Sequence, residues 1–205
     1  MKDKKGALCI YCKYVKRFLD ILFSSVLILL LSPFMLMLSV LIAVESRGGA
    51  IFKQRRMGKN GKAFICYKFR TMRTDAPHNM PAKDIDVEKY VTCVGKFLRR
   101  SSLDELPQLF NVLKGDMSLV GPRPLICEEI ELHRLREEAG IYTLRPGLTG
   151  LAQINGRNLL CDSEKIKNDK IYLDNVRMRL DAKILFRTVL CVLDGKGIVS
   201  VNNSK

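Results

Sequence analysis

The hydrophobic pattern of the chain is dominated by one uninterrupted apolar stretch, Ile21 to Val44, which contains no ionisable residue. Roughly 20 residues at a rise of about 1.5 Å cross the ~30 Å hydrocarbon core of a bilayer, so this stretch is long enough to span a membrane as a helix. Pro33 lies at its middle. Because proline has no N–H for the carbonyl of Leu29 and disfavours helical angles at Ser32, we expect the helix to break there.

The break and the charges around it leave two topologies open. Each half would be about a dozen residues, or ~18 Å, which enters a bilayer without crossing it, and the Ser32 hydroxyl can satisfy a backbone group left unpaired in lipid. Basic flanks are typical of the cytoplasmic side, and a re-entrant hairpin places both flanks there, whereas a proline-kinked single span is the common alternative. The flanking cations are Lys13, Lys16, Arg17, Arg47, Lys53, Arg55, Arg56, Lys59 and Lys62.

The residues that follow the apolar stretch predict a β-hairpin. Residues 51–56 and 63–70 have the composition of short strands, and the turn residues Gly58-Lys59-Asn60-Gly61 lie between them. Residues 74–90 are polar and contain prolines, so we expect a surface loop there, with His78 exposed.

Helical periodicity predicts most of the remaining elements. The apolar residues of 106–113 share one face of a helix that begins near Asp104, tolerates Pro107 in its first turn and is stopped by Lys114-Gly115. His133 is expected to be solvated or structural rather than a metal ligand. The other expected elements are a helix at 94–100, a charged helix at 128–139, a turn-rich loop at 142–150, a helix at 162–176 and an amphipathic basic helix at 180–193.

These elements predict an α/β fold in which a re-entrant N-terminal membrane hairpin, helix-break-helix, precedes one small, mostly helical domain with a short β-hairpin and amphipathic interfacial helices. Without the apolar stretch, the 205-residue chain can form one domain of about 150 residues. The expected divisions are a basic lead-in (1–20), the membrane hairpin (21–46), the catalytic domain (47–198) and a polar tail (199–205).

The charge balance narrows the expected partners. The chain has 35 basic and 21 acidic residues, a net charge of +14, which suits nucleic acid, anionic lipid or phosphorylated substrates. The apolar stretch favours the last two. Nucleic-acid binding is disfavoured because aromatic residues are 7% of the chain and the cations are spread along it. Lys16 and Arg17 are expected to contact lipid headgroups.

The seven cysteines indicate a reducing environment rather than a disulfide framework. Most stand singly in apolar surroundings, which predicts reduced packing residues. Cys9 and Cys12 form one C-x-x-C, and without a second pair this is weak evidence for zinc.

Asp104 and Glu105 are the strongest candidates for chemistry, and two interpretations of them remain open. Ser102-x-x-Glu105 matches a capping box and Asp104 is a good N-cap, which would make both acids structural. Alternatively, the preceding Arg99-Arg100 and the helix start favour bound anions. One carboxylate could then hold Mg²⁺, which accepts one or two carboxylates with phosphate oxygens, while the other attacks an electrophile.

Three arginines lie beside residues that form rigid turns. Arg123 stands between two prolines, Arg145 precedes Pro146-Gly147, and Arg157 follows Asn155-Gly156. A rigid backbone lowers the entropy lost when a guanidinium grips a phosphate with two hydrogen bonds. The alternative is that the prolines and glycines only form turns.

Several motifs resemble those of the bacterial monotopic phosphoglycosyl transferases. The similarity runs in order from about residue 14 to residue 190, and the chain resembles the minimal members, which transfer phospho-N,N′-diacetylbacillosamine and carry no additional N-terminal multi-span region. The matching residues are Lys16-Arg17 with Asp20, Ser32-Pro33, Tyr67 to Met72, Ser102 to Gln108, Gly115 to Ser118, Gly121 to Pro124 and Pro146 to Gly150.

The resemblance implies an enzyme that loads a sugar 1-phosphate from a UDP-sugar onto undecaprenyl phosphate and releases UMP. It implies that Asp104 is the nucleophile of a phosphosugar–aspartyl intermediate, that Glu105 helps bind Mg²⁺, and that Arg99 meets the polyprenyl phosphate. Ser32-Pro33 would return the helix to its side of entry into the bilayer. The implied nucleotide-sugar contacts are Lys68, Arg70, Arg123, Arg145 and Arg157.

The implied location is the bacterial inner membrane, with the catalytic domain on the cytoplasmic face, in contact with membrane lipid and not with nucleic acid. A UDP-linked N-acetylated deoxyhexosamine is the first choice of donor, with UDP-glucose and UDP-galactose as alternatives, and a homodimer is left open. From a different class, a basic membrane-tethered scaffold without catalysis also explains the charge and the apolar stretch.

Overall fold

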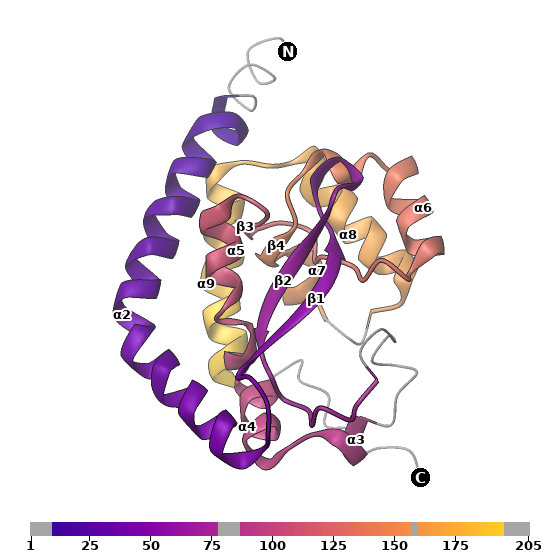
Figure 1. Ribbon diagram of the computed structural model, residues 1–205. Helices are drawn as coiled ribbons and strands as arrows, with labels where there is room; N and C mark the ends of the chain where they lie inside the picture. Colours follow the sequence, from indigo (N-terminus) through magenta and orange to yellow (C-terminus); the bar gives the residue numbers. More distant parts are fainter. Residues whose placement is uncertain (1–9, 78–86, 157–159, 195–205) are drawn as a thin grey trace, which may run out of the picture.

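The computed structural model describes residues 10–77, 87–156 and 160–194, and in it one long helix wraps one side of a mixed domain (Figure 1). This helix, α2 (Lys16–Glu45), follows a π-helical turn at Tyr11–Val15, so part of the basic lead-in is helical. Within the described residues it is the one helix long and apolar enough to cross a membrane.

Pro33 lies inside α2, and the predicted break at this position is wrong because the helix continues through it. The helix is bent near its middle instead (Figure 1). The Ser32 hydroxyl donates to the carbonyl of Leu29 at 3.0 Å, and Leu29 is the residue whose usual N–H donor Pro33 removes. The predicted hydrogen bond of Ser32 is therefore present, and it allows a kink without an unpaired carbonyl.

The N-terminal end of α2 is fixed to the domain through Asp181 of helix α9 (Met178–Asp194). Lys16 Nζ lies 2.6 Å from Asp181 Oδ2, which also accepts from the Tyr11 hydroxyl at 2.7 Å, and Asp181 Oδ1 accepts from the Tyr172 hydroxyl at 2.7 Å. Asp181 is 5% exposed, so the carboxylate is buried among three donors. Burial and this carboxylate raise the pKa of Tyr172.

Arg17 also binds protein groups. It donates to the carbonyls of Val112 and Leu113, at 2.6 and 2.8 Å, at the C-terminal end of helix α5 (Gln108–Lys114). Lys16 and Arg17 thus bind a buried carboxylate and two backbone carbonyls, and their expected contact with lipid headgroups stays a prediction.

The C-terminal end of α2 is fixed by a buried arginine. Arg70, 8% exposed, donates to the carbonyls of Ser46 and Arg47 at 2.7 and 2.9 Å, and so satisfies the groups that follow the last turn of the helix. Glu45 accepts from the backbone N–H of Val94 at 3.0 Å, which joins the same end to α4 (Cys93–Ser101). Both ends of α2 are thus attached to one domain.

The middle of α2 presents a large apolar surface outward. The exposed fractions of Leu29, Leu30 and Leu36 are 76%, 69% and 67%. The opposite face of the C-terminal half, with Leu38 and Ile42, is buried. Both faces of this part of α2 are therefore apolar, but one face packs against the domain and the other is exposed.

Strands β1 (Ile51–Met57) and β2 (Ala63–Phe69) pair antiparallel, which confirms the predicted β-hairpin. Asn60 has a left-handed φ of 56° in the connecting turn, a conformation that asparagine tolerates. On the other edge of β2, Asn111 of α5 accepts from the Tyr67 N–H at 3.0 Å and donates to the Ile65 carbonyl at 2.6 Å. The side-chain amide takes the place of a third strand.

A second pair of strands was not predicted. β3 (Ser118–Val120) and β4 (Gly147–Thr149) are parallel, with Ser118 opposite Gly147. The strands approach so closely that a Cβ on Gly147 would lie 2.1 Å from the backbone nitrogen of Gly121. Three residues are too few to show an alternating pattern, so the sequence predicts no strand at Ser118–Val120 and only a turn-rich loop at 142–150. The 3₁₀ turn Ile141–Thr143 overlaps the start of that loop.

Most of the helices predicted from the sequence are present in the structure. The helices expected at 94–100, 128–139, 162–176 and 180–193 are present as α4, α6 (Ile130–Glu138), α8 (Asp162–Asp174) and α9. Helix α3 (Val87–Tyr90) interrupts the expected loop at 74–90, and His78 lies outside the described residues. The short α7 (Leu151–Ile154) leads into α8. Exposed Cys93 and Cys161 differ from the expected packing role of single cysteines.

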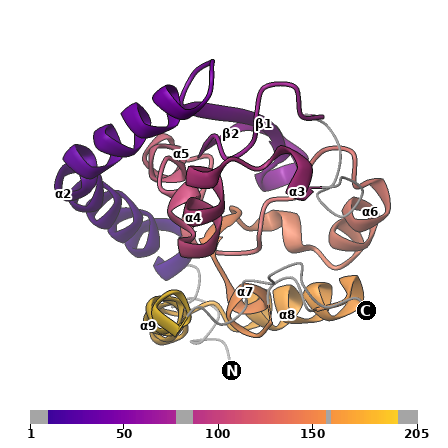
Figure 2. The same ribbon diagram turned by 90° about the horizontal axis from the view of Figure 1, so that it is seen from below.

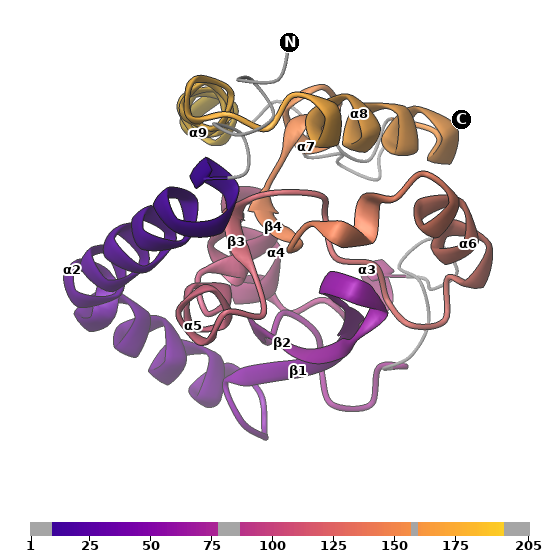
Figure 3. The same ribbon diagram turned by 90° about the horizontal axis from the view of Figure 1, so that it is seen from above.

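The elements form three layers that hold the core between them. Helices α8 and α9 lie on one side, the β1–β2 hairpin lies on the other, and α5 with β3 and β4 lies between them (Figures 2 and 3). The main cluster joins Leu109 and Val112 of α5 to Tyr172 and Ile184 of the outer helices. A second cluster packs the C-terminal half of α2 against β2 and α4, through Met35, Leu38, Ile42, Phe69 and Leu98.

Replacing Asp181 by alanine is expected to lower the free energy of unfolding by about 3–5 kcal/mol, because Lys16 would be left as a buried charge without its partner. The measurement is thermal unfolding of the detergent-solubilised protein. Asp174→Ala is the matched control, since Asp174 forms an exposed pair with Lys170, and it should change stability by less than about 0.5 kcal/mol. Equal melting temperatures for both variants would contradict the role of Asp181.

Candidate active site

Asp104 and Glu105 lie on a 3₁₀ turn (Leu103–Glu105) between α4 and α5. Ser102 closes α4 in the left-handed conformation, with φ of 57°, and its side chain does not cap the turn. Helix α5 begins at Gln108, with Pro107 in the N-cap position. The capping-box interpretation of the two acids and the expected helix start near Asp104 are therefore wrong, and neither carboxylate serves as a helix cap.

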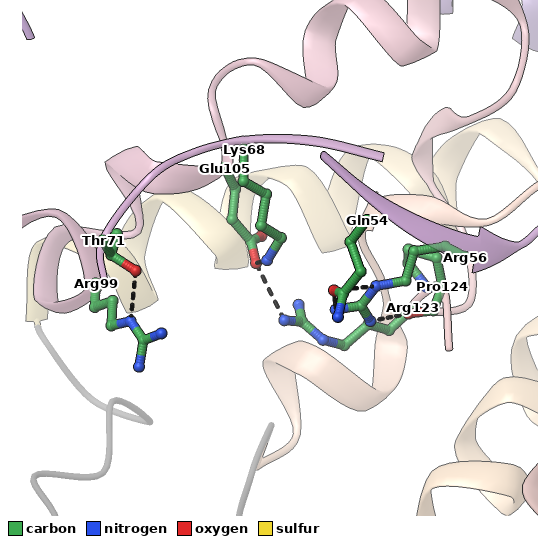
Figure 4. A network of polar contacts seen from close by, with 8 residues as sticks. All are labelled: Gln54, Arg56, Lys68, Thr71, Arg99, Glu105, Arg123 and Pro124. Carbon is green, nitrogen blue, oxygen red and sulfur yellow. Dashed lines mark hydrogen bonds and ion pairs between the residues drawn. The ribbon is translucent and has the colours of Figure 1, made fainter. Parts of the chain in front are cut away.

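Glu105 is bound by two cations from separate segments. Its Oε1 lies 2.9 Å from Lys68 Nζ of β2 and 3.1 Å from Arg123 Nη2 of the loop after β3 (Figure 4). Glu105 is 8% exposed. The fold thus brings together three of the residues that the sequence indicated, Lys68, Glu105 and Arg123.

Asp104 is half-buried next to this ion-pair cluster. Within the described residues, its carboxylate has no hydrogen bond or ion pair. Burial raises the pKa of the Asp104 carboxyl most strongly and Glu105 raises it further, while the charges of Lys68, Arg123 and Arg99 act in the opposite direction. A carboxylate that has no fixed partner and lies among cations is chemically available to an electrophile that carries phosphate.

Arg99 approaches from α4. Its Nε donates to the Thr71 hydroxyl at 2.8 Å, and burial lowers the pKa of the guanidinium while Asp104 raises it. Figure 4 shows the terminal nitrogens of Arg99 pointing away from Thr71, with Arg99 on one side of the Lys68–Glu105 pair and Arg123 on the other. The cluster therefore has a guanidinium on each side of the Lys68–Glu105 pair.

Two residues of this cluster were missed by the sequence analysis. Arg56 donates through Nε and Nη2 to Gln54 Oε1, at 3.0 and 2.6 Å, and through Nη1 to the carbonyl of Pro124 at 2.8 Å. The strand register places Phe52 opposite Lys68 and Gln54 opposite Cys66. Since residues two apart share a face of a strand, this spacing could have placed Gln54 and Arg56 beside Lys68.

Arg70 and Arg145 donate to backbone carbonyls elsewhere in the fold, and their expected role as substrate contacts stays a prediction. Arg70 is the buried donor at the end of α2, and Arg145 Nε donates to the carbonyl of Gly115 at 2.9 Å. A Cβ on Gly115 would lie 3.3 Å from Arg17 Nη2, so Arg145 lies toward the N-terminal part of α2. Arg157 is outside the described residues.

The two acids fit a magnesium ion that arrives with a substrate. In the described part of the chain, no group of three or more His, Cys, Asp or Glu residues is placed to hold a metal by itself. Mg²⁺ commonly uses one or two carboxylates, with phosphate oxygens and waters completing its octahedron. Asp104 and Glu105 offer that set, and Lys68 and Arg123 now share the Glu105 carboxylate.

Comparison with known proteins identifies relatives of this chain. The model of the family described as bacterial sugar transferase matches residues 11–195. The chain is 39% identical over 201 residues to the undecaprenyl-phosphate galactose phosphotransferase of Salmonella typhimurium, and the match covers 90% of this chain and 42% of that protein. It is 40% identical over 191 residues to EpsL of Bacillus subtilis, named an uncharacterized sugar transferase, with 92% of each chain covered.

A third relative is the UDP-N-acetylgalactosamine-undecaprenyl-phosphate N-acetylgalactosaminephosphotransferase of Aeromonas hydrophila. It is 40% identical over 194 residues, which cover 90% of this chain and 45% of that protein. The chain thus spans less than half the length of the Salmonella and Aeromonas relatives and nearly the whole of EpsL.

The raised pKa of Asp104 predicts a pH-dependent stability. Between the pKa of an unfolded aspartyl group, about 3.9, and the higher folded value, the folded state binds more protons, so stability falls as pH rises through this window. Asp104→Asn should therefore melt about 2–4 °C above the parent at pH 7, on the order of 1 kcal/mol for a chain of this size, and the difference should shrink toward pH 4.

Scanning calorimetry between pH 4 and 7 measures this difference. Asp75→Asn is the control, because Asp75 is exposed and its hydrogen bond to Arg73 lowers its pKa, so its loss should not stabilise the protein. A difference for Asp104→Asn that grows on acidification would contradict the assigned direction.

Proposed function

Because the chain belongs to the bacterial sugar transferase family, we propose that it transfers a sugar 1-phosphate from a UDP-sugar to undecaprenyl phosphate and releases UMP. The observation that carries this proposal is the Asp104 carboxylate, which has no partner among the described residues and lies within the field of Lys68, Arg99 and Arg123. The names of the Salmonella and Aeromonas relatives support the acceptor, and that of the Aeromonas protein supports the donor class.

The proposed reaction has two displacements at one phosphorus. A carboxylate oxygen of Asp104 attacks the phosphorus that bears the sugar, the bond from this phosphorus to the bridging oxygen breaks, and UMP leaves with that oxygen. A phosphosugar–aspartyl intermediate remains. An oxygen of undecaprenyl phosphate then attacks the same phosphorus, the acyl phosphate bond breaks, and the Asp104 carboxylate is restored beside a polyprenyl diphosphate-linked sugar.

The cations of the cluster have distinct roles in this scheme. Attack by one anion on another requires screening, and fixed positive groups supply it before the reaction begins. Lys68 and Arg123 hold Glu105 in place and stabilise charge on the transferred phosphoryl group, while Arg99 faces the incoming lipid phosphate. A magnesium ion held by Glu105, with the neighbouring Asp104 and substrate oxygens, would neutralise charge on the diphosphate.

We propose a UDP-linked N-acetylated deoxyhexosamine as the donor, with UDP-glucose or UDP-galactose as the alternatives. The resemblance to the minimal enzymes favours the first, and the relatives compared above are named for galactose and N-acetylgalactosamine. The product would serve as the first membrane-bound intermediate of a glycoconjugate such as a glycoprotein, an O-antigen or a capsule.

We also propose that α2 is re-entrant and holds the domain at the cytoplasmic headgroup level of a bacterial inner membrane. The support is the attachment of both ends of the helix to one domain, through Asp181 near its start and Arg70 at its end. The exposed apolar face around Leu29, Leu30 and Leu36 would then enter lipid and return. Such a depth lets a long polyprenyl phosphate present its headgroup to Arg99 without leaving the bilayer.

Asp104→Asn is expected to reduce UMP release at least about 10³-fold, because the nucleophile of the first displacement is lost. The assay supplies a panel of UDP-sugars with undecaprenyl phosphate and Mg²⁺ in detergent. Asp75→Asn, an exposed acid outside the cluster, should retain the parent rate. The parent enzyme should also show ping-pong kinetics and a radiolabelled adduct from the labelled donor that hydroxylamine releases.

Two results of the same experiment would count against the proposal. Full transfer by a folded Asp104→Asn variant would exclude Asp104 as the nucleophile. A labelled adduct that persists in this variant would place the covalent intermediate on another residue.

The topology has its own test. In a background in which all seven native cysteines are replaced by serine, single cysteines introduced as Tyr14→Cys and Lys59→Cys should react with a membrane-impermeant maleimide in inverted vesicles and not in intact cells. Leu30→Cys, in the middle of the exposed apolar face, should be protected in both. Labelling of Tyr14→Cys and Lys59→Cys from opposite sides would establish a single span.

A further inference from the structure

The loop that carries Arg123 is fixed by donors to four consecutive carbonyls. The carbonyl of Pro122 accepts from the N–H of Gly147 at 2.8 Å, and that of Leu125 accepts from the N–H of Met57 at 2.9 Å. The two carbonyls between them accept from side chains. Arg136 Nη1 donates to Arg123 at 2.7 Å, and Arg56 Nη1 donates to Pro124 at 2.8 Å.

Arg136 belongs to a buried ion pair that has no role in the proposed chemistry. Its Nη2 lies 2.7 Å from Asp169 Oδ2, and the two residues are 4% and 1% exposed. Burial raises the pKa of the Asp169 carboxyl, and the charge of Arg136 opposes that rise. Neither group can touch a substrate at the surface, so the pair acts within the protein or not at all.

Stability alone is a poor explanation for this pair. Removing two charges from water costs about as much as their attraction returns, so apolar residues of the same volume are often equally stable. What an apolar pair cannot do is donate to a carbonyl. The guanidinium of Arg136 uses one nitrogen for Asp169 and another for the carbonyl of Arg123, and this fork links α8 to the active-site loop.

We propose that Arg136, held by Asp169, is a positioning residue that sets the direction of the Arg123 side chain toward Glu105. The ring of Pro122 fixes its own φ, and the ring of Pro124 confines Arg123 to extended backbone angles. An anchored Arg123 carbonyl therefore further restricts rotation about the Cα–C bond of Arg123. That torsion determines where Cβ points. The catalytic consequence rests on the proposed function, whereas the control of loop geometry does not.

The kinetic test is a double-mutant cycle. Arg136→Lys keeps one charge for Asp169 but loses the simultaneous bond to Arg123, and it should lower kcat for UMP release about 10- to 100-fold with less than a 3-fold change in KM for the UDP-sugar. In an Arg123→Met background, Arg136→Lys should cause less than a 2-fold further loss, because its effect passes through Arg123. Additive losses in the cycle would overturn the proposal.

Leu132→Ala is the matched control for instability. Leu132 is buried on α6 one turn before Arg136, so its loss weakens the same helix without touching the loop carbonyls. At a temperature where both variants are folded, Leu132→Ala should keep kcat within 2-fold of the parent. An equal fall in kcat for both variants would show that Arg136 acts through stability only.

Hydrogen exchange tests the loop geometry without turnover. In Arg136→Lys, the amides of Met57 and Gly147, which hold the same loop, should exchange at least 10-fold faster than in the parent, and they should be unchanged in Leu132→Ala. If Arg136→Lys does not fold, Asp169→Asn supplies the same comparison, because it leaves Arg136 without its charged partner. Unchanged exchange would overturn the proposal, whereas faster exchange in a protein that releases no UMP would refute only the proposed function.

Discussion

The attachment of both ends of α2 to one domain is the constraint on which the rest of the structure depends. This helix of 30 residues contains Pro33 and is bent near its middle, and both of its ends lie against the domain. The first tie gathers three donors on the buried carboxylate of Asp181, and the second uses Arg70 to satisfy the carbonyls that end the helix. Arg70 directly follows strand β2, so the second attachment fixes the position of the β1–β2 hairpin, and of the neighbouring 3₁₀ turn with Asp104, relative to α2.

The arginines around the candidate active site fall into two groups with different binding partners. Some guanidiniums satisfy backbone carbonyls inside the protein, as Arg17, Arg70 and Arg136 do, and these stiffen the segments on which the cluster is built. Others, Arg99 and Arg123, direct charge toward the two acids. Burial of the guanidiniums in the first group is tolerated because each donates to at least two acceptors, although Nε of Arg70 and Nε of Arg136 have no partner among the described residues. The arginines of this basic chain therefore stabilise the fold as well as surround the two acids with positive charge.

Sequence patterns predicted the elements that are long enough to show a repeating pattern of apolar residues, and they also singled out the adjacent acids Asp104 and Glu105. The apolar stretch, the β-hairpin and the helices α4, α5, α6, α8 and α9 were predicted from the sequence, and Asp104-Glu105 was found because two carboxylates follow two arginines. The pattern did not distinguish Arg70, which binds carbonyls, from Arg123, which binds Glu105, because the same side chain serves both and only tertiary contacts decide. Strands of three residues carry no period, so β3 and β4 could not be predicted. The Ser32 hydroxyl was expected to satisfy a backbone group, but local rules for proline favour a break and did not predict that α2 continues through Pro33.

The side chain of Asn111 has a further consequence for the hairpin. An open strand edge offers unpaired N–H and C=O groups to any other chain, and proteins commonly protect such edges against aggregation. Here one amide occupies the edge of β2 at Tyr67 and Ile65. The N–H of Tyr67 and the carbonyl of Ile65 are therefore not open to a strand of another chain at this edge of the sheet.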